Sequence, residues 1–139
     1  MKQPMSLKTL DLWHGQAQEC GCWHLTGFQI TLTNGHSSRA ETSGQKLSSR
    51  KYQIPQDRRI GKVGMVGKPV GNKLFIVSMY FYEPGGHEIF MWSPGGWEKD
   101  DPEVRYEEQV LPDGQELIGI YGTKEVDSHI KQIGLILKR

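Results

Sequence analysis

The densest group of chemically reactive side chains lies near the start of the chain. Residues 14–24 hold two imidazoles and two thiols, from His14, Cys20, Cys22 and His24. Two thiolates and two imidazoles form the donor set of a tetrahedral zinc site. The Cys-x-Cys spacing is tighter than in zinc knuckles, however, and no second cysteine pair follows. Two incidental thiols in a turn are therefore the favoured interpretation, zinc is the alternative, and no cofactor is predicted.

Catalysis has little support in the residue pattern. The sequence contains no Gly-x-Ser-x-Gly nucleophile elbow, no phosphate-binding glycine loop and no His-Glu-x-x-His pair. Carboxylates are frequent, but their spacing does not pair two of them for general acid–base chemistry. The sequence predicts a protein that binds a partner and is not an enzyme.

Aromatic side chains offer one kind of contact surface. Their faces, on which sugar rings and protein partners both pack, come from Tyr80, Tyr82, Trp92, Trp97 and Tyr106. Trp97 follows a Ser-Pro-Gly-Gly turn, which makes it the best candidate for an exposed contact.

Charged side chains separate along the sequence. The basic group consists of Lys46, Arg50, Lys51, Arg58 and Arg59. The acidic group consists of Glu98, Asp100, Asp101, Glu103, Glu107 and Glu108. Such groups are usually solvated surface that protects edge strands. The sharper alternative is that they pair between molecules, in a homo-oligomer or a larger assembly.

Composition places the chain among ordinary globular domains. Its 139 residues are 36% apolar and 24% charged, and the formal net charge of +1 gives no overall attraction to nucleic acid. No apolar run approaches a membrane span or forms the core of a signal peptide. We expect a cytoplasmic protein with reduced cysteines that binds no nucleic acid and does not insert into membranes. A secreted chain with its signal removed would have the same composition.

Two apolar patterns repeat along the chain and predict its elements. An alternating segment ending in glycine occurs at 10–15, 63–67 and 118–122. A second pattern, leading into a strand, occurs at 25–30, 76–81 and 130–135. The matching positions are Leu10, Val63 and Ile118 in the first pattern and Phe28, Met79 and Ile133 in the second. Steps of about 50 residues are typical of a repeated supersecondary unit.

Turn residues predict how each repeat folds. Asn34-Gly35 is a strong hairpin signal, and Pro84-Gly85-Gly86 and Pro112-Asp113-Gly114 also predict turns. Each repeat is therefore predicted to be a four-stranded antiparallel unit, at roughly 7–50, 58–108 and 112–139 of a single domain spanning 1–139. Three such units should surround one shared core.

The predicted strand 74–82 is apolar on both faces. Simple alternation places one set of side chains in the core, namely Phe75, Val77, Met79 and Phe81. The opposite face then carries Leu74, Ile76, Tyr80 and Tyr82. We expect both faces to be buried.

Two parts of the sequence resemble jacalin-like lectin domains. Residues 115–122 followed by 130–137 resemble the closing segment of such a domain, and residues 25–35 are similar to a strand pair of its first sheet. The resemblance covers nearly the whole chain. It implies an all-β fold, the β-prism, in which three four-stranded Greek-key sheets surround a pseudo-three-fold axis.

The resemblance also implies a function. Most members of the family bind carbohydrate without metal or catalysis, in a loop after the glycine that ends the first strand of a repeat. Backbone N–H groups and an aspartate just before the next strand hold the sugar hydroxyls, a task that suits a charged acceptor. Here Thr26, Val77 and Lys131 occupy the aspartate position. The family site is therefore altered or lost.

Candidate carbohydrate-binding residues come from two loops and one turn. They are Gly122, Thr123, Lys124, Glu125 and Asp127 in the third repeat, Trp23 and His24 in the first, and Trp97. Glu125 and Asp127 would replace the missing acceptor if their loop folds back. The prediction is a lectin-like module that binds a glycan through loops at one end of the prism. The alternative, favoured by the missing aspartates, is a structural subunit that kept the fold, lost sugar binding and takes a protein partner.

Overall fold

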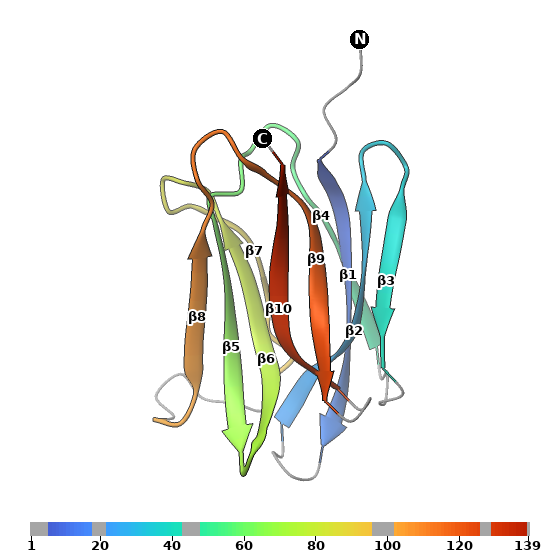
Figure 1. The fold of residues 1–139 in the computed structure, drawn as a ribbon, viewed down its shortest axis with the longest axis vertical. Helices are drawn as coiled ribbons and strands as arrows, with labels where there is room; N and C mark the ends of the chain where they lie inside the picture. Colours follow the sequence, from blue (N-terminus) through green and yellow to red (C-terminus); the bar gives the residue numbers. More distant parts are fainter. Residues whose placement is uncertain (1–5, 18–21, 43–47, 96–101, 126–128, 139) are drawn as a thin grey trace.

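The fold consists of antiparallel strands arranged in three sheets around a common centre (Figure 1). The computed structural model describes residues 6–17, 22–42, 48–95, 102–125 and 129–138. The first sheet has the strand order β3-β2-β1-β4, the second β7-β6-β5-β8 and the third β10-β9. This is an all-β prism, as predicted.

The strands of the first sheet are β1 (Leu7–Ala17), β2 (Cys22–Leu32), β3 (Ser37–Glu41) and β4 (Ser48–Gln53). Those of the second are β5 (Lys62–Val70), β6 (Lys73–Tyr82), β7 (Glu88–Trp92) and β8 (Arg105–Val110). The third sheet contains β9 (Glu116–Glu125) and β10 (His129–Lys138). The first two sheets thus have the four strands expected and share one topology. In the described part of the chain the third sheet has two strands, so the expected three-fold symmetry is only partly present.

One apolar core joins the three sheets. Buried side chains from every sheet contribute to it, including Leu10 of β1, Phe81 of β6 and Ile120 of β9. An apolar face of each sheet leaves water against the other two, which is the driving force for the prism. The predicted shared core is confirmed.

Three turns between consecutive strands contain a glycine. Gly35, Gly86 and Gly114 have φ angles of 87°, 94° and 80°, in the left-handed region that favours glycine. Each lies in a turn predicted from the sequence. Local turn chemistry alone was sufficient to locate these reversals.

Each repeat carries a β-bulge at the same place. In each pairing of the first with the second strand of a repeat, one residue of the second strand has no partner on the first. This residue is Thr26, Val77 or Lys131. The bulge residues are the positions where the family aspartate was expected. The repeat found by apolar spacing in the second strands is therefore a repeat of pairing geometry as well.

The bulge at Val77 changes which side chains of β6 face the core. Met79 and Phe81 lie in the shared core as predicted. Before the bulge the alternation is reversed, because an extra residue shifts every earlier side chain to the other face. Ile76 therefore lies in the core, whereas Phe75 and Val77 join a separate buried cluster. The prediction for these three residues was wrong.

Candidate functional site

The strand ends that were expected to frame a binding site lie at one end of the prism (Figure 1). β1 ends there at Ala17 and β2 begins at Cys22, while β9 ends at Glu125 and β10 begins at His129. We call this the loop end. The connections 18–21 and 126–128, which include Cys20 and the candidate Asp127, lie outside the described residues.

The third-repeat candidates belong to a strand. Gly122, Thr123, Lys124 and Glu125 continue β9 and pair with β10, Gly122 opposite Ile133 and Glu125 opposite His129. The predicted loop starting at Gly122 is therefore wrong, and the connection is shorter. Sequence reasoning aligned the three strand-ending glycines, but they do not share a register. Counted from the bulge, the position of Gly122 in β9 matches Leu12 in β1, so Ile120 rather than Ile118 matches Leu10.

The aspartate positions of the first two repeats are closed to a ligand. Thr26 and Val77 are both completely buried. The carbonyl of Thr26 also accepts a hydrogen bond from the hydroxyl of Thr42 at 2.7 Å. Neither position can present a hydrogen-bonding group to a sugar. Lys131, whose side chain is outside the described part, occupies the third.

Trp23, His14 and His24 are described residues near the loop end. The His14 ring meets Trp23 edge-on with ring centres 5.2 Å apart, and the His24 ring meets Phe75 edge-on at 4.9 Å. The backbone N–H of Trp23 donates to the backbone carbonyl of Gly95 at 3.4 Å. These contacts join the first sheet to β6 and to the segment after β7. Sequence reasoning missed Gly95 and Phe75 because both are far from Trp23 along the chain.

Burial separates these candidates. His24 is buried against Phe75, so its side chain cannot reach a ligand, whereas Trp23 remains partly exposed. Trp92 is also buried in the core and presents no face to a ligand. Trp97 lies outside the described residues. Trp23 is thus a candidate whose described side chain can contact a ligand.

The zinc alternative concerns the same segment. His14 and His24 each pack against a different aromatic ring, and the Cys22 side chain is outside the described part. Within the described residues no three histidine, cysteine or acidic side chains group as metal ligands. The rings of His14 and His24 both make packing contacts in this structure.

His14 should make the stability of the protein depend on pH. Burial lowers its pKa below the ordinary 6.5, so the folded state binds a proton more weakly than the unfolded state. The stability from this site is present above pH 6.5 and is lost as the pH falls through the lowered pKa of folded His14. We expect His14→Gln to lose less stability than the natural chain between about pH 7 and about pH 5 in urea denaturation. His36→Gln, in an exposed turn, is the control and should behave like the natural chain; equal pH dependence of all three proteins would contradict the prediction.

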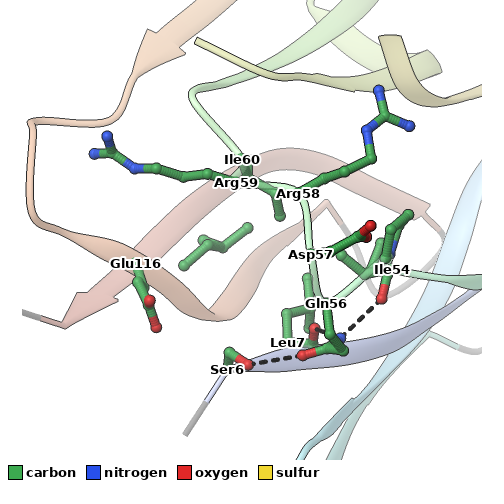
Figure 2. A pocket seen from close by; sticks show the side chains of 11 residues that line it. Ser6, Leu7, Ile54, Gln56, Asp57, Arg58, Arg59, Ile60 and Glu116 are labelled. Carbon is green, nitrogen blue, oxygen red and sulfur yellow. Dashed lines mark hydrogen bonds between the residues drawn. The ribbon is translucent and has the colours of Figure 1, made fainter. Parts of the chain in front are cut away.

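A cavity of about 250 Å³ lies at the opposite end of the prism. Figure 2 shows Arg58 and Arg59 at its edge, with their guanidinium groups directed away from each other. Arg58 contacts the Glu83 carboxylate at 3.1 Å, which lowers the pKa of Glu83. Arg59 donates to the carbonyl of Pro112 at 2.9 Å. Both cations thus fasten neighbouring segments.

Two further polar residues of this cavity, Ser6 and Gln56, also join segments of the protein. Gln56 donates to the carbonyls of Leu7 and Ile54 at 3.1 Å and 2.8 Å and accepts from the Ser6 hydroxyl (Figure 2). These bonds tie the connection between β4 and β5 to the start of β1. The geometry supports a structural role for this end.

No helix in the described residues is long and apolar enough to span a membrane.

Comparison with solved structures identifies the fold. The chain superimposes on jacalin in complex with mellibiose with a TM-score of 0.67, covering 96% of this chain and 92% of jacalin at 11% identity. For artocarpin in complex with mannotriose the TM-score is 0.64, with 96% of this chain and 84% of that chain covered at 12% identity. For PirB it is 0.68, with 98% of this chain but 30% of that chain covered at 9% identity. No protein-family model and no curated protein matches the sequence. The chain is a jacalin-like β-prism domain in fold.

Proposed function

We propose that this protein is a non-enzymatic carbohydrate-binding module whose sugar site lies at the loop end. The observation that carries the proposal is that nearly the whole chain adopts the fold of jacalin and artocarpin, both solved with bound saccharides. Fold alone does not establish function. Trp23 adds the chemistry, because a partly exposed indole at the loop end offers an apolar face on which a sugar ring can pack.

Burial of the family's aspartate position in two repeats bears on where a sugar could bind. Thr26 and Val77 are buried, so the first two repeats cannot supply an acceptor at the family position. We propose that Trp23 acts at the loop end together with the third-repeat candidates. Asp127 and Glu125 retain the role of candidate acceptors for sugar hydroxyls.

Calorimetric titration of the full chain with mellibiose and with methyl α-mannoside tests this proposal. We expect saturable binding to one of them, weakened about ten-fold or more in Trp23→Ala because the stacking face is lost. Trp13→Ala is the matched control, since Trp13 lies in the same sheet but packs under Arg39, with the guanidinium 4.7 Å from its ring. Its affinity should stay unchanged. Absence of saturable binding by the folded protein would overturn the proposal.

A second candidate function, self-association through strand edges, has a specific observation behind it. β4 and β8 are equivalent outer strands of the first two sheets. Arg50 and Lys51 on β4 occupy the same register positions, counted from the bulge, as Glu107 and Glu108 on β8. Like charges oppose pairing of identical edges, whereas opposite charges favour β4 of one copy beside β8 of another. Failure of the sugar titration together with salt-sensitive association in sedimentation would favour this function.

A further inference from the structure

The outer face of the second sheet carries a groove of about 590 Å³. Its central row crosses three strands, from Tyr80 of β6 over Gly64 of β5 to Glu108 of β8. Because Gly64 has no side chain, the Tyr80 ring lies over β5, and its hydroxyl donates to Oε2 of Glu108 at 2.6 Å. The floor of the groove is therefore a buried tyrosine ring anchored at its far end.

The neighbouring rows supply the sides of the groove. Lys62 pairs with Tyr82 on one side, and Val66 pairs with Tyr106 on the other. The Tyr106 side chain is prominent, with 52% of the residue exposed. Tyr82 and Tyr106 thus lie on either side of Tyr80. The volume is within the range of about 300–1,000 Å³ that is usual for small-ligand sites.

A charged pair lies within this aromatic frame. Lys62 Nζ is 3.6 Å from Glu108 Oε2 and 5.5 Å from the centre of the Tyr82 ring. Burial and the hydrogen bond to Glu108 raise the pKa of Tyr80 above its ordinary 10.0, so its hydroxyl remains a donor. An ionised carboxylate has lone pairs for about four hydrogen bonds. Glu108 can therefore accept further hydrogen bonds while Lys62 donates them.

These groups select the chemical class of the ligand. A cation would have to displace Lys62, which already occupies the positions over Tyr82 and beside Glu108. An anion would meet the Glu108 carboxylate. A neutral ligand with apolar faces and hydroxyl groups that both donate and accept meets neither obstacle. A pyranose with equatorial hydroxyls has this character, because its ring faces carry C–H groups and its rim carries the hydroxyls.

We propose that this tyrosine groove, formed by Lys62, Tyr80, Tyr82, Tyr106 and Glu108, is a separate binding site for β-linked glucose-type oligosaccharides. A sugar ring packs on the exposed Tyr106 side chain, Tyr80 and Tyr82 form the apolar floor and side of the groove, and the Lys62–Glu108 pair bonds adjacent hydroxyls. The site belongs to the second sheet and shares none of these residues with the loop end. It does not depend on the function proposed above.

NMR titration of the ¹⁵N-labelled full chain with cellotriose tests this site and locates it. We expect saturable shifts of the amides of β5, β6 and β8 around the groove. Tyr106→Ala should weaken binding about ten-fold, since an exposed stacking face is lost. Tyr121→Ala is the matched control, because Tyr121 is equally exposed, at 55%, but lies on the third sheet. Glu108→Gln, which keeps an acceptor for Tyr80 and loses the charge, should also weaken binding.

The outcomes separate the two sugar sites. Shifts confined to the loop end, lost in Trp23→Ala and kept in Tyr106→Ala, would overturn the groove and leave the loop-end site in place. Shifts at the groove that persist in Trp23→Ala support the groove whatever happens at the loop end. Absence of saturable shifts with cellotriose, or equal affinity of Tyr106→Ala and the natural chain, would overturn the proposal.

Discussion

Phe81→Ala is expected to lower the free energy of unfolding by about 3–5 kcal/mol, the usual cost of removing a buried phenylalanine ring. Phe81 is completely buried in the shared core. Its ring meets Phe90 of β7 at 4.4 Å between centres, and Phe90 meets Tyr52 of β4 at 4.5 Å. The Tyr52 hydroxyl then donates to the carbonyl of Met91 at 3.1 Å. This row of rings packs the second sheet against the first.

The loss of Phe81 should therefore act on the junction between two sheets as well as on one strand. Urea denaturation followed by far-ultraviolet circular dichroism would measure the change. Val110→Ala is the control, because Val110 lies on β8 with 76% of its surface exposed and should change stability by less than about 0.5 kcal/mol. A loss below about 1 kcal/mol for Phe81→Ala would show that the core relaxes around the cavity and that the ring contacts matter little.

Gly64→Ala is expected to cost about 2–3 kcal/mol, an overpacking effect. An added Cβ would lie 2.1 Å from Cζ of Tyr80, so the ring must move. Tyr80 is only 7% exposed and is tied to Glu108, and moving it breaks that hydrogen bond and opens its buried cluster. The substitution should also abolish the tyrosine groove.

The third sheet offers a matched control for this substitution. Gly134 of β10 pairs with Tyr121 of β9, so here the tyrosine is on the first strand and the glycine on the second. A Cβ added at Gly134 would lie 2.0 Å from Cζ of Tyr121. Tyr121 is largely exposed and can turn into solvent, so Gly134→Ala should cost less than about 1 kcal/mol. Gly64→Ala combined with Tyr80→Ala should cost less than the sum of the single substitutions. Equal costs at Gly64 and Gly134 would contradict the role given to burial of the tyrosine.

The bulges explain why alternation predicted only part of β6. Its apolar residues correctly indicated a strand with two buried faces. Alternation correctly assigned Met79 and Phe81 to the core, but it failed at Val77 and at the residues before it. A bulge is a property of the pair of strands, since it appears only when β6 is aligned with β5. The residues of β6 alone contain no comparable signal.

The candidate binding residues show the same division. Tyr80, Tyr82 and Tyr106 stand out in the sequence as aromatic residues, but Lys62 does not, and nothing local links it to Glu108. Lys62 and Glu108 approach to within 3.6 Å because β5 pairs with β8. At the loop end, likewise, the contact of Trp23 with Gly95 depends on the packing of one sheet against another.

The sequence by itself indicated most of the strands, three of the turns and the spacing of the repeat, and its resemblance to jacalin-like lectin domains implied the prism. These features can be predicted from the sequence because turn glycines and apolar alternation act over a few consecutive residues. The tertiary structure decided the core face of β6, the two-stranded third sheet of the described part and the strand position of Gly122. It also brought together His14 with Trp23 and Lys62 with Glu108. These features depend on pairing and packing between distant segments, whose free energy is gained only when the sheets assemble.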